Sequence, residues 1–124
     1  MIDPVTSQMF LVSKGDKAIL FEVPSASGTL KEEFQLKGIK EPITGCDISQ
    51  DGSDIILVGT DNMFLFKRES GESVQDAMER EPKNIGASVK GQCEAVTFES
   101  KDRDPGFFSI TEGSNEVMHF FKRK

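Results

Sequence analysis

The sequence has no tryptophan and no tyrosine, and it has only one histidine and two cysteines. The lack of Trp excludes the WD-repeat class of β-propellers. The ten Phe rings have no polar tip and suit a dry core, so a sugar-binding surface is disfavoured. Cys46 and Cys93 are too few for a disulfide framework. Two free thiols are expected, with one disulfide between them as the alternative.

Positive charge is also scarce, with 15 Lys and Arg against 21 Asp and Glu and a net charge of −6. Phosphate backbones and anionic membrane surfaces would be repelled, so we expect neither a nucleic-acid nor a membrane partner. The basic end at 119–124 is interpreted as a solubilising terminus. No secretory signal and no membrane span is predicted in these residues. We expect a soluble chain and leave its compartment open, with an extracellular location as the alternative if the N-terminus is truncated.

What the sequence does contain is one apolar run repeated along the chain. The run at 7–14 matches the run at 53–60, an offset of 46 residues, and recurs at 106–112, 52 residues after 54–60. Each copy is followed by a short polar connection and another apolar run. The second and third copies are also preceded by a run that ends in a turn. Four antiparallel strands at this period are typical of a propeller blade.

We therefore predict an all-β fold, a partial β-propeller of about three four-stranded blades. The single domain 1–124 divides into blades at about 1–38, 39–89 and 90–124. Outer strands are expected at 32–36 and 83–85, the first blade keeps only residues 2–4 of its innermost strand, and the third lacks an outer strand. An immunoglobulin-like sandwich is the alternative, but its two sheets do not require such self-similarity.

One short surface helix is predicted at 71–80. Ser73 is the N-cap candidate, and Asp76 stands at the capping-box position three residues later. Pro82 marks the stop. Because the apolar stripe contains only Val74, Ala77 and Met78, we expect the helix to decorate the surface.

Three segments carry a family resemblance: DPVT followed by MFLVSK at 3–14, ITGCDISQDG at 43–52, and GQCEAVTF at 91–98. They resemble the C-terminal blades of a group of largely uncharacterised bacterial and animal β-propellers, which are similar in blade pattern to lactonase-like and phytase-esterase-like propellers. Those proteins have further blades before this point. The resemblance therefore implies a ring closed by other blades. These would come from a homo-oligomer, most simply a dimer of six blades, or from the remainder of a longer propeller.

Aligning the turns places Thr44 over Glu94, both on innermost strands that would line a central channel together with Asp47. In lactonase-like propellers, which this chain resembles, an acidic residue opening the inner strand helps to hold a central Ca²⁺. The resemblance thus implies Ca²⁺ as the cofactor candidate, with Glu94, Asp47, Glu112 and Asn115 as its ligands. These are fewer than the six to eight oxygens that Ca²⁺ takes.

No catalytic residue is predicted. The lone His119 lies between Met118 and Phe120 on an outlying strand, and the sequence has no nucleophile elbow, phosphate loop or paired His ligands. A reactive Cys93 beside Glu94 is the minor alternative. The sequence favours a non-enzymatic propeller module that binds partners and associates with itself. A Ca²⁺-dependent hydrolase of the lactonase or phosphoesterase kind, acting at the channel, is the alternative function.

Overall fold

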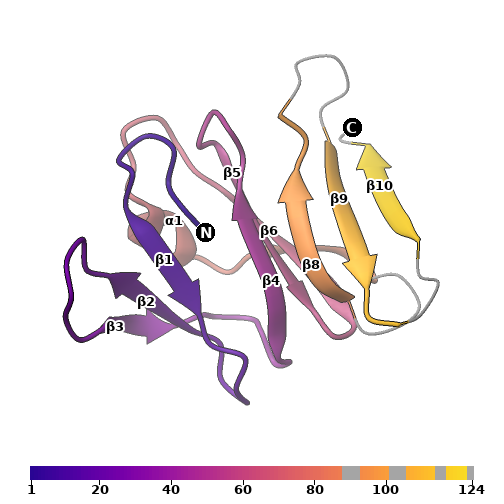
Figure 1. Ribbon diagram of the computed structural model, residues 1–124, viewed down its shortest axis with the longest axis horizontal. Helices are drawn as coiled ribbons and strands as arrows, with labels where there is room; N and C mark the ends of the chain where they lie inside the picture. The colour runs from indigo at the N-terminus through magenta and orange to yellow at the C-terminus, as the bar shows by residue number, and fades with distance from the viewer. Residues whose placement is uncertain (88–92, 101–105, 114–116, 123–124) are drawn as a thin grey trace.

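The computed structural model describes residues 1–87, 93–100, 106–113 and 117–122, which form three antiparallel sheets (Figure 1). The first sheet has the order β1 (Met9–Val12), β2 (Ile19–Val23), β3 (Lys31–Gln35). The second has β4 (Ile43–Ile48), β5 (Asp54–Gly59), β6 (Asn62–Lys67), β7 (Lys83–Ala87). The third has β8 (Cys93–Phe98), β9 (Gly106–Thr111), β10 (Met118–Lys122). The all-β prediction is confirmed, and the described strands form three sheets where a sandwich would have two.

One backbone hydrogen bond is found at corresponding positions before each of β1, β5 and β9. The three bonds run from Asp3 N to Gln8 O (2.8 Å), from Ser49 N to Asp54 O (2.9 Å) and from Glu99 N to Gly106 O (3.0 Å). The residue before each donor pairs with the residue after each acceptor: Ile2 with Met9, Ile48 with Ile55, and Phe98 with Phe107. The first sheet therefore keeps only an isolated bridge at Ile2 where the others have a full first strand.

The sheets are stacked in chain order with a core on each side of the second sheet. One core joins the first and second sheets through Phe10, Leu20, Ile55 and Leu57, among others. The other joins the second and third sheets, with Ile56, Val58 and Met63 against Cys93, Val96 and Phe107. Because successive residues of a strand face opposite sides, β5 must be apolar on both faces, and all six of its residues are buried.

The short helix α1 (Val74–Met78) lies between β6 and β7 and begins as predicted. The Ser73 hydroxyl accepts a hydrogen bond from Asp76 N at 3.0 Å. The helix lies at the surface on its polar side, where Asp76 and Glu79 are exposed. The expectation that it only decorates the surface is not met, because Val74, Ala77 and Met78 are buried in the core between the first two sheets. In so short a helix three apolar residues are enough to cover the inward face.

The second and third sheets meet mainly through β4 and β5 on one side and β8 on the other. β9 and β10 lie beyond β8 on one side of this contact, and the first sheet lies on the opposite side (Figure 1). The described residues include no helix long and apolar enough to cross a membrane.

Candidate functional site

The predicted channel residues lie where β4 approaches β8. In both strands the pairing with the next strand is interrupted by a bulge, between Ile43 and Gly45 in β4 and between Cys93 and Ala95 in β8. Thr44 and Glu94 are the bulged residues. They therefore occupy corresponding positions, as the alignment of the turns predicts. A bulge re-aims the side chain it carries, and here it directs two polar side chains out of the regular alternation.

Thr44 is used to hold the two strands together. Its hydroxyl lies 3.2 Å from the carbonyl oxygen of Val58 on the neighbouring strand of its own sheet, and it also reaches the carbonyl oxygen of Cys93 on β8. The hydroxyl has one proton and donates it to one of these acceptors at a time. Thr44 thus links the second sheet to the third.

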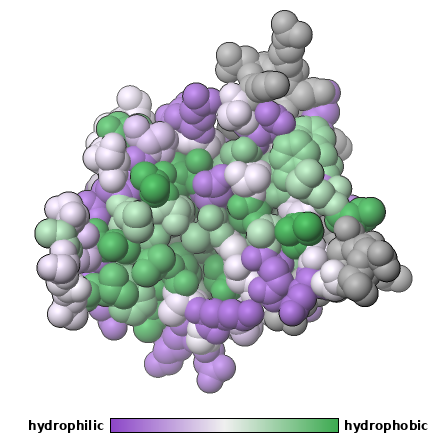
Figure 2. All heavy atoms as spheres, viewed as in Figure 1, coloured by the Kyte–Doolittle hydropathy of each residue, from purple (hydrophilic) through white to green (hydrophobic). Residues whose placement is uncertain are grey.

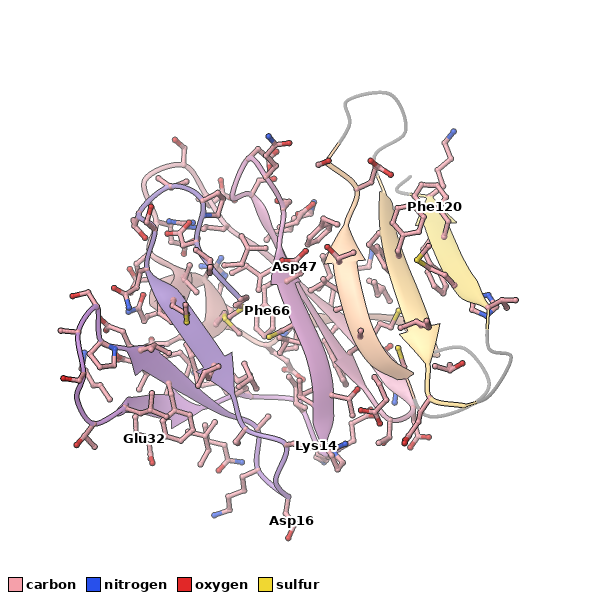
Figure 3. The ribbon with its side chains drawn as sticks, in the orientation of Figure 1. Lys14, Asp16, Glu32, Asp47, Phe66 and Phe120 are labelled. Atoms are coloured by element: carbon pink, nitrogen blue, oxygen red, sulfur yellow. The ribbon has the colours of Figure 1, made fainter. Side chains whose placement is uncertain are left out.

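Asp47 makes a second link, three residues further along β4. Its Oδ2 atom accepts hydrogen bonds from the Phe98 backbone N–H at 2.8 Å and from the Thr97 hydroxyl at 3.0 Å. Figure 3 shows Asp47 on β4 beside β8, toward the end opposite Lys14. Both donors belong to β8, so this carboxylate links strands of two different sheets.

Gly45, between these two residues, lets the backbones approach closely. A Cβ atom added at this position would lie 3.1 Å from Val96 N and 3.2 Å from the Cα of Ala95. Backbone atoms cannot yield as a flexible side chain can, so only glycine fits without moving a strand.

Glu94 is less firmly held than Thr44 and Asp47. Its Oε2 atom lies 3.4 Å from Nζ of Lys14, which follows β1, so this contact brings the first and third sheets together. The Lys14 side chain is more than half exposed, which makes the pair a weak one. Oε1 of Glu94 is buried and has no hydrogen-bond partner among the residues described.

The four predicted calcium ligands are not seen to converge. Among the residues that the structure describes, no three His, Cys, Asp or Glu side chains are grouped so as to hold a metal ion. Glu112 is exposed after β9, and Asn115 lies outside the described residues. The calcium site therefore stays a prediction from the sequence.

The two thiols are free, so the disulfide alternative is wrong. Cys93 is fully buried, with its sulfur against the Ser109 hydroxyl, which removes it from any reagent in solution. Burial raises the pKa of the Cys46 thiol, an effect that outweighs the opposing influence of the nearby amino terminus. His119 is half-buried on β10, where it pairs with Ser109.

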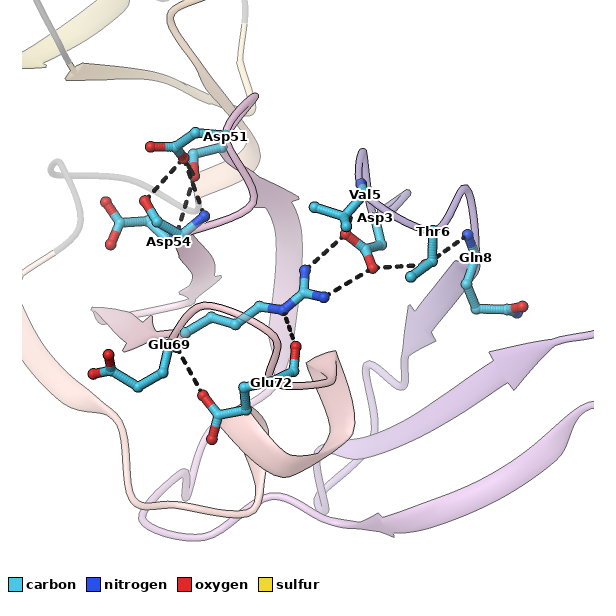
Figure 4. Close-up of polar contacts among 11 residues, drawn as sticks. Asp3, Val5, Thr6, Gln8, Asp51, Asp54, Glu69 and Glu72 are labelled. Carbon is cyan, nitrogen blue, oxygen red and sulfur yellow. Dashed lines mark hydrogen bonds and ion pairs between the residues drawn. The ribbon is translucent and has the colours of Figure 1, made fainter.

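Sequence reasoning missed a buried ion pair between Asp3 and Arg68, whose side chains are 2% and 7% exposed. Arg68 donates from both terminal nitrogens to the carboxylate, and its Nε donates to Glu72 O at 2.6 Å (Figure 4). Thr6 Oγ1 and Val5 N complete the shell around Asp3. Burial raises the pKa of Asp3, but the hydrogen bonds from Arg68, Thr6 and Val5 and the charge of Arg68 together leave it below its ordinary value.

Arg68 also lines a hollow of about 480 Å³. Its walls are the turn at 51–53, the segment 69–73 and the residues Val5 and Thr6. The sequence has one signal for Asp3, because it belongs to the DPVT motif and corresponds to Ser49 and Glu99 in the repeat. No motif in the sequence indicated that Arg68 would be its partner.

Comparison with known proteins does not add to this geometry. No protein-family model matches the chain, and a search of curated proteins found no match.

Proposed function

We propose that this chain is a run of three β-propeller blades that acts as a non-enzymatic binding module and associates with a second copy of itself. The observation that carries the proposal is the contact between β4 and β8, the first strands of two successive sheets. Thr44 and Asp47 fasten these strands, and Gly45 lets them approach. A propeller brings the first strands of its blades together around the axis and spreads the later strands outward.

The stacking order supports the same proposal. Each sheet is built from strands that follow one another in the chain, and each neighbouring pair of sheets encloses an apolar core. Three blades leave two open ends, and open sheet faces and edges favour association with another chain. Two copies of three blades give six, which is the simplest closed ring.

A binding role fits the residues at the inner strands better than a catalytic one. Thr44 and Asp47 use their polar atoms to join strands, and Cys93 is covered. Propellers bind their partners with the loops at the ends of the channel, so we expect a protein partner at those loops. A net charge of −6 favours a partner that is not itself a polyanion.

The test is the mass in solution, measured by light scattering across a wide range of protein concentration. We expect a species of twice the monomer mass of 13.7 kDa. A monomer at every concentration would contradict self-association.

A further inference from the structure

Leu11 and Leu57 occupy corresponding positions in the first and second sheets, 46 residues apart, in the register set by the shared turn hydrogen bonds. Leu57 is 0% exposed because the first sheet covers it, whereas Leu11 is 44% exposed. The same residue at the same position thus differs only in whether a preceding sheet lies over it.

A second matched pair is found at the other end of the stack. Met63 lies opposite Val58 in the second sheet, and Met118 lies opposite Ile110 in the third, with Val58 and Ile110 at corresponding positions. Met63 is 2% exposed under the third sheet, whereas Met118 is 64% exposed. Among the described residues, no further sheet lies over Met118.

These positions define two apolar faces on opposite ends of the stack. The back face, on the first sheet, contains exposed Met9 and Leu11 and the half-buried Ile19, Phe21 and Val23. The front face, on the third sheet, contains exposed Ile110, Met118 and Phe120 and half-buried Phe108. Figure 2 shows apolar atoms at the surface over the first sheet and again beside β9 and β10, where Figure 3 places the Phe120 ring.

The front face also has a recess of the kind that a neighbouring sheet fills. A shallow, almost wholly apolar hollow of about 100 Å³ lies over β8 and β9, with Phe108, Ile110 and Met118 among its lining residues. In the second sheet the corresponding residues Ile56, Val58 and Met63 receive the side chains of the third sheet. Exposed apolar surface with such a packed equivalent inside the same molecule indicates an interface.

We propose that the front face of one copy packs on the back face of a second copy, head to tail, as the second sheet packs on the third within the chain. This inference rests on the self-association proposed above and specifies its surfaces. A second copy is the occupant chosen because it carries the complementary face on the same scaffold. Two such contacts related by a two-fold axis leave neither face exposed.

The experiment uses opposite charges placed on the two faces of the full chain. Leu11→Lys alters the back face only, and Met118→Glu alters the front face only. Each variant alone should lose the dimer, with dimer dissociation raised by on the order of a hundredfold, because an unpaired charge would be buried at both contacts. An equimolar mixture should recover the dimer, since one contact is then unaltered and the other pairs Lys with Glu.

Val5→Lys and Val5→Glu are the matched controls, because Val5 is exposed but lies on neither face. They should leave the mass unchanged, and circular dichroism should show that every variant stays folded. A wild-type dimer that only one face variant disrupts would overturn the head-to-tail pairing while self-association stands. Failure of the mixture to recover the dimer would overturn it as well. A monomeric wild type would overturn the proposed self-association itself.

Discussion

Arg68 and Asp3, 65 positions apart in the sequence, form a buried two-point ion pair, with Nη1 2.7 Å from Oδ1 and Nη2 3.2 Å from Oδ2. The pair fastens the turn before β1 to the end of β6. It therefore joins the first sheet to the second on the side where the first sheet has no full first strand.

Asp3→Asn should destabilise the fold strongly, because it leaves the Arg68 guanidinium buried without its charge partner. Removing one member of a buried pair costs about 3 to 5 kcal/mol. Because Arg68 keeps its hydrogen bond to Glu72 O, we expect a loss at the lower end of this range, about 3 kcal/mol. Urea unfolding measures it. The double variant Asp3→Leu with Arg68→Met should lose less than Asp3→Asn, since no buried charge remains. Equal losses would contradict this account.

Stability should fall with acidification below about pH 4.5. The pKa of Glu72 is lowered from 4.5 to about 2, chiefly by the Arg80 hydrogen bond, and that of Asp3 also lies below its ordinary value of 3.8. The pKa of each carboxyl is lower in the folded state than in the unfolded state. Between pH 4.5 and about pH 2 the unfolded chain therefore binds more protons than the folded chain. Their contribution is complete above pH 4.5 and is lost as the pH falls toward 2.

Thermal unfolding between pH 6 and pH 2 checks this dependence. Glu72→Gln and Arg80→Gln should each reduce the dependence of the unfolding temperature on pH to a similar degree. The double variant should reduce it little further, because both substitutions remove the same interaction. Fully additive effects would show that the two side chains act separately.

Much of the fold could be predicted because its signals are local. The apolar run of β5 indicates a strand that is buried on both faces, and Ser73 with Asp76 indicates where the helix begins. The burial of α1 could not be read in the same way. Whether Val74 and Met78 face a core or solvent depends on the first sheet, which is distant in the sequence.

For the candidate site, too, the positions of residues in the repeat could be predicted, whereas their contacts could not. Matching turns placed Thr44 and Glu94 at corresponding positions, since a repeat aligns residues without knowledge of their contacts. The contacts of these side chains could not be predicted from the sequence. Asp47 is a carboxylate and so a candidate metal ligand, but its hydrogen bonds from β8 depend on the spacing between two sheets, which no local sequence pattern records.

Asp47→Ala should cost about 1 to 3 kcal/mol, because the Phe98 N–H loses its acceptor at the junction of β4 and β8. Asp47→Asn should cost less, since the amide oxygen can still accept that bond. Urea unfolding of both variants separates the cases. If the two lost equal stability, the hydrogen bond to Phe98 would not be the cause.

Calcium at millimolar concentration should leave the unfolding temperature unchanged relative to a chelated sample. A cation bound only by the folded state would raise it. Asp47 already accepts two hydrogen bonds from β8, and no three ligand side chains are grouped among the residues described. A rise that Glu94→Gln abolishes would instead favour the calcium-dependent hydrolase.

Gly45→Ala should lower the unfolding temperature, because the new methyl group would meet the backbone of Val96 and Ala95 at 3.1 and 3.2 Å. Overpacking of this kind costs about 1 to 3 kcal/mol. Gly15→Ala is the matched control, since its methyl group would have only Lys17 at 3.8 Å as its nearest neighbour. If β4 and β8 are the adjoining first strands of two blades, Gly45→Ala should also speed hydrogen exchange at β8 more than at β2. Uniform acceleration across both strands would argue that the substitution loosens the whole chain and not this junction.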